Sequence, residues 1–434
     1  MKNLLFHFIG IGGISMSALA FYIKSCGYNV QGSDIHKSKI TDDLQRLGIK
    51  VFFGHKKSNL SNVDVVIYNY AIKRDNVELK YSKENKIKTY SRGELLGLIS
   101  QKYKNVISIA GSHGKTSTTE MIYNCLLVAG MNPTLHIGGI IKGHSFGFIN
   151  GDKNYFITEA CEYHDCFLNL KSKVGVVLNV EPEHLDYFKS FYNEKLSYKK
   201  YLENSNLTIS NFDCSNKNNI SFGFDNKNII AKNVMNRKGK FSYDAYINGK
   251  FFAHIDLGCY GQHSVINSLA VIGVCVQLNV PKKYVKIGLC MPLNIQRRFE
   301  IIKKQPLVVH DYAHHPTEIK ETIQTFKNCT NKKVLVVFQP HTYSRTKTLF
   351  NEFLTCFDNV DMLYLIKTFP AREKPDKSAS AFALYKALKF NGKNCKYFAS
   401  FSLAKEKIQE KAVQGYDILI LGAGDIVNLA YSLK

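Results

Sequence analysis

The sequence lacks the cysteine patterns that would indicate a zinc site or a disulfide-linked fold. Its 11 cysteines include no C-x-x-C pair, and the closest two, Cys161 and Cys166, have no matching second pair. A structural zinc site is therefore not predicted. So many scattered thiols over 434 residues fit a reducing cytoplasm better than a secreted, disulfide-linked protein.

Acidic residues are scarce, because 35 Asp and Glu stand against 58 Lys and Arg, for a formal net charge of +23. Such a charge is typical of nucleic-acid-binding proteins. However, the lysines are dispersed, and no RNA-binding aromatic signature is present. We therefore predict no nucleic-acid partner. A composition rich in Lys, Asn, Ile and Tyr, with solvated lysines, accounts for the charge, and a small anionic substrate would also profit from the positive field. With 45% hydrophobic and 21% charged residues, the chain is expected to fold around a large core.

The chain also lacks an uninterrupted apolar run near its start. Residues 4–23 are about as long as a membrane span, which takes roughly 20 apolar residues, and they follow Lys2 as a signal peptide's apolar region would. Yet Gly10, Gly12 and Gly13 fall in the middle, where glycine disfavours a helix. We therefore predict neither export nor membrane insertion. The protein is expected to be cytoplasmic.

What this stretch contains is a strand, a glycine turn and a helix. Residues 4–10 predict a buried strand, residues 14–27 a helix, and residues 28–34 a second strand that ends at Asp34. This is the layout of a dinucleotide-type fold, in which the amides at the helix start bind phosphate. The G-x-G-x-x-G pattern is only partly met, since Ser15 takes the third glycine position. These residues alone leave open a nicotinamide cofactor or another nucleotide.

A second glycine loop carries a stronger signal. Residues 104–110 predict a strand, the letters GSHGKTS follow at 111–117, and a helix is expected to about Ala129. G-K-T between a strand and a helix predicts a phosphate loop for ATP or GTP, with Lys115 on the phosphates and the Thr116 hydroxyl on Mg²⁺. Ile109 replaces the usual first glycine. Two nucleotide corners in one chain favour a ligase that activates a carboxylate with ATP on a nucleotide-linked substrate.

The rest of the chain alternates strand-like and helical runs, which predicts an α/β protein. Residues 205–255 are expected to form a small β insertion or edge hairpin, and domain boundaries are expected near residues 98 and 298. Further strands are predicted at 64–72, 155–160, 174–180, 306–312, 333–340, 361–369 and 416–424.

Several longer motifs resemble those of one family, the Mur ligases, nearly from end to end. In chain order they are HFIGIGGISMSALA, AGSHGKTSTT, EACEYHDCFLNL, LNVEPEHLDYF, GQHSVINSLAVI, QRRFE, HDYAHHPTEI, FQPHTYSRT and GAGDI. The second resembles the family's G-T-H-G-K-T loop, with Ser112 in place of threonine.

The resemblance implies a three-domain α/β fold. A Rossmann-like domain for the UDP substrate is expected over residues 1–98, a P-loop ATPase domain over 99–297, and a Rossmann-like amino-acid domain over 298–434. The branch it resembles most joins L-alanine to UDP-N-acetylmuramate at the expense of ATP, with Mg²⁺, in cytoplasmic peptidoglycan precursor synthesis. A monomer or homodimer is expected.

The resemblance also assigns residues to sites. The UDP substrate would contact Gly10, Gly12, Gly13, Ile14, Ser15 and Asp34. ATP would contact Gly111, Ser112, His113, Gly114, Lys115, Thr116, Ser117, Asn267, Arg298 and Asp311. Mg²⁺ would be held by Thr116, Glu162 and His184, and catalysis would depend on Lys115, Glu162 and His184. The amino acid would contact Tyr312, His314 and Arg345.

Two departures from the family pattern bear on specificity. Thr342 stands where many relatives have arginine, and YNYAI at residues 68–72 replaces a serine-rich segment near Asn69. We therefore expect a preference for L-alanine with tolerance of glycine or L-serine. No carbamylated lysine is predicted.

Four other functions compete with this interpretation. A recycling ligase would attach a tripeptide to the same UDP sugar, and product analysis separates it from an alanine ligase. A nicotinamide oxidoreductase leaves the phosphate loop unexplained. A nucleic-acid-binding protein would show a steep salt dependence. A catalytically silent scaffold would have no need to keep Lys115, Thr116, Glu162 and His184.

Overall fold

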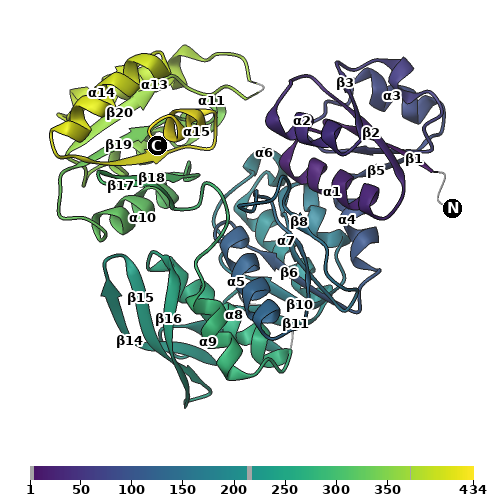
Figure 1. Ribbon diagram of the computed structural model, residues 1–434, viewed down its shortest axis with the longest axis horizontal. Helices are drawn as coiled ribbons and strands as arrows, with labels where there is room; N and C mark the ends of the chain where they lie inside the picture. The colour runs from purple at the N-terminus through teal and green to yellow at the C-terminus, as the bar shows by residue number, and fades with distance from the viewer. Residues whose placement is uncertain (1–3, 213–217, 372) are drawn as a thin grey trace. The chain divides into compact units, whose positions relative to one another are not determined.

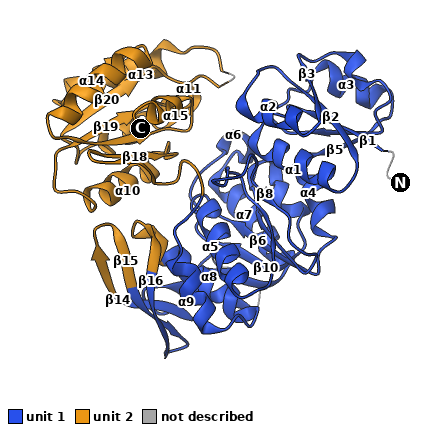
Figure 2. Ribbon diagram, in the orientation of Figure 1, with its two compact units in different colours: residues 1–233, 243–256, 266–294 blue, residues 234–242, 257–265, 295–434 orange. Residues whose placement is uncertain are grey.

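The computed structural model describes residues 4–212, 218–371 and 373–434, which divide into two compact units. Unit 1 comprises residues 1–233, 243–256 and 266–294, and unit 2 comprises residues 234–242, 257–265 and 295–434 (Figure 2). Each unit is α/β, as predicted. The expected domain boundaries near residues 98 and 298 stay predictions.

The first sheet of unit 1 is parallel and has the strand order β3-β2-β1-β4-β5. Four of its strands, β1, β2, β3 and β5, are labelled in Figure 1. Its strands are β1 (Leu5–Ile9), β2 (Asn29–Asp34), β3 (Lys50–Phe53), β4 (Val65–Tyr68) and β5 (Lys88–Ser91). Its helices are α1 (Ile14–Ser25), α2 (Lys39–Arg46), the 3₁₀ turn η1 (Lys57–Leu60), α3 (Val77–Glu84) and α4 (Arg92–Ser100). The glycine-interrupted stretch is therefore a strand, a turn and a helix. Among the described residues, no helix has both the length and the apolar character that a bilayer span requires.

The second sheet of unit 1 has the order β12-β11-β10-β6-β9-β7-β8 and is parallel except between β7 and β8. Its strands are β6 (Asn105–Ala110), β7 (Thr134–His136), β8 (Phe148–Ile149), β9 (Tyr155–Glu159), β10 (Ser172–Val177), β11 (Ser205–Ser210) and β12 (Asn219–Ile220). The helices in this part of the chain are α5 (Lys115–Val128), η2 (Tyr163–Asn169), α6 (Leu185–Phe188), α7 (Phe191–Glu203), α8 (His263–Gln277) and α9 (Lys282–Cys290).

The predicted β insertion is shorter than expected. A separate four-stranded sheet is formed by β13 (Phe222–Gly223), β14 (Ile229–Arg237), β15 (Lys240–Ile247) and β16 (Lys250–Tyr260). Residues 205–210, which we placed in the insertion, instead form β11 beside β10 in the second sheet. The last three residues of β11 are buried there, so burial rather than local sequence determines which sheet it joins.

Unit 2 contains a six-stranded sheet with the order β17-β18-β22-β19-β20-β21, parallel except between β17 and β18. Its strands are β17 (Glu300–Lys304), β18 (Leu307–Asp311), β19 (Val334–Phe338), β20 (Met362–Ile366), β21 (Cys395–Phe398) and β22 (Asp417–Leu421). Its helices are α10 (Pro316–Lys327), α11 (Tyr343–Thr348), α12 (Phe350–Thr355), η3 (Lys377–Ala379), α13 (Ala381–Phe390), α14 (Phe401–Val413) and α15 (Ile426–Tyr431). Alternate residues of β19 and β22 enter two different apolar clusters, which shows that both faces of this sheet are covered.

Candidate active site

The glycine turn after β1 is held by the end of β2. The amides of Gly10 and Ile11 donate to the carbonyl oxygen of Ser33 at 2.8 and 3.0 Å, and the amide of Gly12 donates to Oδ2 of Asp34 at 2.9 Å. Gly10 has a φ of 78°, in the left-handed region that favours glycine. Helix α1 then begins without a side-chain cap, so the amides of its first turn are available to an anion.

A cationic side chain lies beside this turn. Nη1 of Arg92, the first residue of α4, donates to Oγ of Ser15 at 3.3 Å, and Nε2 of His136 lies 3.4 Å from the same oxygen. Burial, followed by the positive charge of Arg92, lowers the pKa of His136 to about 3. The histidine is therefore neutral near pH 7, and Arg92 supplies the charge at this place.

One cavity of about 320 Å³ joins the glycine turn to the phosphate loop within unit 1. Gly13, Ile14 and Ser15 line it together with Lys115. Its other lining residues are Met16, Asn69, Tyr70, Ala71, Arg92, His136, Gly138, Glu159, Cys161, Tyr163 and Cys166. The two predicted nucleotide corners therefore open into the same space.

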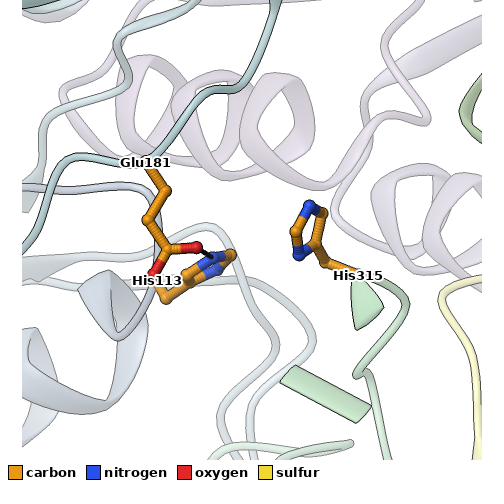
Figure 3. A group of neighbouring side chains, drawn as sticks. All are labelled: His113, Glu181 and His315. Carbon is orange, nitrogen blue, oxygen red and sulfur yellow. Dashed lines mark hydrogen bonds and ion pairs between the residues drawn. The ribbon is translucent and has the colours of Figure 1, made fainter. Parts of the chain in front are cut away.

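The second glycine loop connects β6 to α5, as predicted. Gly111 and Gly114 have φ values of 141° and 84°, which favour glycine. The loop is bonded to the segment after β10, because the amide of His113 donates to Oδ1 of Asn179 at 2.8 Å. Nε2 of the His113 imidazole also lies 3.3 Å from Oε2 of Glu181 (Figure 3). Thr116 and Ser117 follow in the first turn of α5.

Lys115 is paired with a buried carboxylate. Its Nζ lies 3.2 Å from each carboxylate oxygen of Glu162 and donates to the carbonyl oxygens of Gly111 and Ser112. Burial by itself lowers the pKa of Lys115, but the negative charges of Glu162 and Glu183 outweigh it and raise that pKa to about 12. The lysine is therefore a fixed positive charge at the phosphate loop.

The same carboxylate belongs to a group that fits a divalent cation. Glu162, Glu183 and His184 offer ligand atoms that all lie within 4.8 Å of one another. Nε2 of His184 is 3.6 Å from Oε1 of Glu162. Glu162 is only 2% exposed. The two carboxylates offer the oxygen donors that Mg²⁺ prefers. Glu162 and His184 were predicted; Glu183 was not.

Asn267 of α8 is brought directly against the phosphate loop. A Cβ atom added to Gly114 would lie 2.7 Å from Nδ2 of Asn267, so only glycine leaves room for this approach. Asn267 is buried. The structure thus places this predicted ATP contact beside the loop.

In unit 2, Asp311 holds the loop that carries Arg298. Its carboxylate accepts the amides of Phe299 at 2.6 Å and Ala313 at 2.8 Å. Burial raises the pKa of Asp311, against the lowering effect of Arg298. The guanidinium of Arg298 lies 5.3 Å from the ring centroid of Tyr312. These two predicted ATP contacts therefore lie close together at the end of β18.

The predicted amino-acid residues of unit 2 form a chain of neighbours with one residue that we did not predict, His341. The rings of Tyr312 and His314 are 5.2 Å apart, those of His314 and His341 are 6.0 Å apart, and Nη1 of Arg345 donates to the carbonyl oxygen of His341 at 2.8 Å. Burial lowers the pKa of His314 to about 3, and Arg345 acts in the same direction against Glu318. Oγ1 of Thr342 donates to Oε1 of Glu373 at 2.7 Å.

Sequence reasoning missed four residues at these places. Glu183 directly precedes the predicted His184 in an acidic segment, so that segment already contained its signal. Arg92 and His136 belong to no motif and reach the cavity from separate elements. His341 lies within the FQPHTYSRT motif, but no pattern indicated that it lies beside Arg345.

Lys115 of the phosphate loop and the start of α1 line the same cavity, an arrangement typical of enzymes that bring two phosphate-bearing ligands together. Comparison with known proteins identifies the family of this chain. The model "Mur ligase family, catalytic domain" matches residues 5–104, "Mur ligase middle domain" matches 109–275, and "Mur ligase, glutamate ligase domain" matches 297–424. The chain belongs to the Mur ligase family.

Similar proteins match along nearly the whole chain. A UDP-N-acetylmuramate–L-alanine ligase of Clostridium acetobutylicum is 38% identical over 438 residues, covering 98% of this chain and 96% of that protein. One from Clostridium tetani is 39% identical, covering 97% and 95%. The crystal structure of UDP-N-acetylmuramate-alanine ligase MurC from Thermotoga maritima aligns with a TM-score of 0.85 at 25% identity, covering 99% and 98%. A murein peptide ligase from Psychrobacter arcticus shares the fold, with a TM-score of 0.71 at 19% identity.

Proposed function

We propose that this protein joins L-alanine to the carboxylate of UDP-N-acetylmuramate with conversion of ATP to ADP and phosphate, in peptidoglycan precursor synthesis. The observation that carries the proposal is the single cavity lined by both the α1 anion corner and Lys115. It accounts for a nucleotide-linked substrate that meets ATP. The names of relatives 38–39% identical over nearly the full chain supply the particular substrates.

The chemistry follows from the unreactivity of a carboxylate toward an amine. Transfer of the γ-phosphoryl group of ATP to a carboxylate oxygen gives an acyl phosphate, whose phosphate is a good leaving group. The alanine amine then attacks the carbonyl carbon, and phosphate departs from the tetrahedral intermediate. Such a transfer needs neutralisation of charge more than a side-chain nucleophile. Lys115 supplies that neutralisation as a fixed positive charge.

Mg²⁺ is the second proposed source of positive charge. Glu162, His184 and the Thr116 hydroxyl would hold it, and Glu183 adds a second carboxylate to the group. When bound, the ion would neutralise the phosphate oxygens during transfer. The position of Glu162 supports this proposal, because its carboxylate lies close to both Lys115 and His184.

The remaining contacts are proposed in three groups. The α1 corner, with Ser15, would hold the diphosphate of the UDP sugar, and Arg92 adds a positive charge there. Asn267, Arg298 and Asp311 would contact ATP. Tyr312, His314 and Arg345 would hold alanine, because a guanidinium binds a carboxylate through two parallel hydrogen bonds.

We also propose a cytoplasmic location. The 11 cysteines of the sequence are scattered and include no C-x-x-C pair, which fits a reducing compartment, and ATP is abundant there.

ADP release tests the proposed function. Purified protein receives ATP, Mg²⁺ and UDP-N-acetylmuramate with L-alanine, glycine, L-serine or the tripeptide, and the products are identified by mass. L-alanine should give the highest kcat/KM, and glycine should follow at about one tenth or less, because one methyl group is worth only about 1–3 kcal/mol. A product formed with the tripeptide and not with L-alanine would overturn the proposal in favour of a recycling ligase.

A further inference from the structure

A buried polar cluster joins α3 to strands of the first sheet, and none of its residues lines the cavity. Its centre is Glu78 of α3, whose side chain is fully buried. Oε2 accepts from Oγ of Ser33 at 2.5 Å and lies 2.8 Å from Nδ1 of His55, while Oε1 accepts from Nδ2 of Asn59 at 2.7 Å. Nε2 of His7, in the middle of β1, lies 3.6 Å from Oε2.

So many partners keep this carboxylate ionised. Burial by itself raises the pKa of Glu78, but the hydrogen bonds from His55 and Ser33 and the nearby His7 outweigh it and hold that pKa well below its usual range. A buried charge persists only when its hydrogen bonds are satisfied, and loss of one partner is costly. The cluster is therefore rigid and sensitive to the loss of a single member.

The cluster is connected to the glycine turn through one residue. The hydroxyl of Ser33 donates a hydrogen bond to Glu78. The backbone carbonyl oxygen of Ser33 accepts from the amides of Gly10 and Ile11 at 2.8 and 3.0 Å. The next residue, Asp34, accepts the amide of Gly12. Three consecutive amides of the turn thus depend on where the last two residues of β2 lie, and Glu78 accepts a hydrogen bond from the side chain of the first of those two, Ser33.

We propose that Glu78 is a positioning residue for the nucleotide-linked substrate, acting through Ser33 on the turn that presents α1 to the diphosphate. The inference rests on the proposed function for the identity of that substrate. It assigns the buried cluster to substrate affinity, not only to the stability of the first sheet.

The test compares three variants. Glu78→Gln keeps the shape but removes the charge and places an amide against two donors. Ser33→Ala removes the connection, together with the contact of the Ser33 hydroxyl with Nδ1 of His55 at 3.0 Å, and leaves Glu78 bonded to His55 and Asn59. Glu84→Gln, an exposed position on the same helix, is the matched control. Two readouts are taken for each: steady-state constants for all three substrates, and the dissociation constant of UDP by calorimetry, which needs no ligation.

We expect both Glu78→Gln and Ser33→Ala to raise the KM for UDP-N-acetylmuramate and the dissociation constant of UDP about tenfold, as for loss of one charged hydrogen bond. The KM values for ATP and L-alanine, and kcat, should stay within about twofold, and Glu84→Gln should match wild type.

A lower melting temperature with unchanged UDP affinity in the folded Ser33→Ala protein would overturn the inference, because the cluster would then be structural only. Should Glu78→Gln not fold, Ser33→Ala decides the question alone. Wild-type protein that binds UDP but forms no product would instead contradict the proposed function and leave this inference standing.

Discussion

The two cations assigned to the proposed reaction, Lys115 in unit 1 and Arg345 in unit 2, have opposite electrostatic surroundings. Lys115 is already neutralised by Glu162 at 3.2 Å. Arg345 donates to the backbone of His341 and, among the described residues, forms no ion pair with a carboxylate. To bind a phosphate, Lys115 would have to exchange one anion for another, whereas the guanidinium of Arg345 can bind a carboxylate directly.

The two regions also differ in what they are made of. The phosphate loop consists of consecutive residues and presents backbone amides, so its shape depends on Gly111 and Gly114. The unit 2 cluster consists of side chains that follow different strands, such as His314 after β18 and Arg345 after β19. We infer that the first region is preformed by local sequence, and that the second tolerates change at single positions such as Thr342.

The largest expected effect is that of Lys115→Ala. Removal of this charge should lower the ligation rate by about a thousandfold, as loss of a group that neutralises developing charge does. ADP release with all substrates present measures it, and the circular dichroism spectrum shows that the protein is folded. The exposed Lys171→Ala serves as control. Turnover near that of wild type in a folded Lys115→Ala protein would remove the contrast between the two cations.

Glu162→Gln tests the other half of the same pair. We expect kcat/KM to fall about a hundredfold and the Mg²⁺ concentration for half-maximal rate to rise, since a neutral amide is a poor ligand for a hard cation. A Mg²⁺ titration at fixed ATP measures both. Glu203→Gln at the exposed end of α7 is the control. An unchanged Mg²⁺ requirement would show that this carboxylate does not bind the ion.

Arg345→Ala addresses the unpaired cation. The KM for L-alanine should rise about thirtyfold, because charged hydrogen bonds contribute about 1.5–3 kcal/mol each. The KM for UDP-N-acetylmuramate should not change. Thr342→Ala should alter the alanine KM no more than about twofold, since its hydroxyl is bonded to Glu373. Equal effects of Arg345→Ala on both substrates would place the alanine carboxylate elsewhere.

The smallest effect concerns pH and unit 2. Burial lowers the pKa of His310 to about 4, and burial likewise lowers those of His314 to about 3 and His341 to about 4. Unfolded histidines titrate near 6.5, so below that pH the unfolded chain binds more protons than the folded one. The contribution of these histidines to the free energy of unfolding should therefore fall as the pH is lowered below about 6.5.

Urea unfolding at pH 7 and pH 5.5 measures this loss, which should be about 1 kcal/mol per histidine. His310→Asn should reduce the loss by that amount, while the exposed His144→Asn should not. An equal loss in wild type and His310→Asn would mean that His310 is not held neutral in the folded protein.

Most of the fold could be predicted because strands buried on both faces leave a strong pattern. All five residues of β19 and of β22 are buried, and both strands were predicted. The sequence of β11 does not say which sheet it joins, since that choice depends on β10 as its partner. Its assignment to the insertion was therefore wrong.

The residues of the candidate site and its support fall into two classes, those that the sequence predicts and those that it does not. The phosphate loop was predictable because amides, lysine and threonine must follow each other in the chain. Arg92, His136 and Glu78 were not, because each acts through a partner far along the sequence, as Glu78 does through Ser33. No local pattern records such a pairing.

The Lys115–Glu162 pair links two binding equilibria. In the proposed reaction Lys115 would leave Glu162 to reach a phosphate oxygen, and Glu162 would leave Lys115 to ligate the cation. The free energy of separating them is spent once, whichever ligand comes first. Nucleotide and cation should therefore raise each other's affinity by the same factor, a reciprocal coupling that elsewhere amounts to about 1–3 kcal/mol. The chain thus favours the loaded state over either half-loaded one.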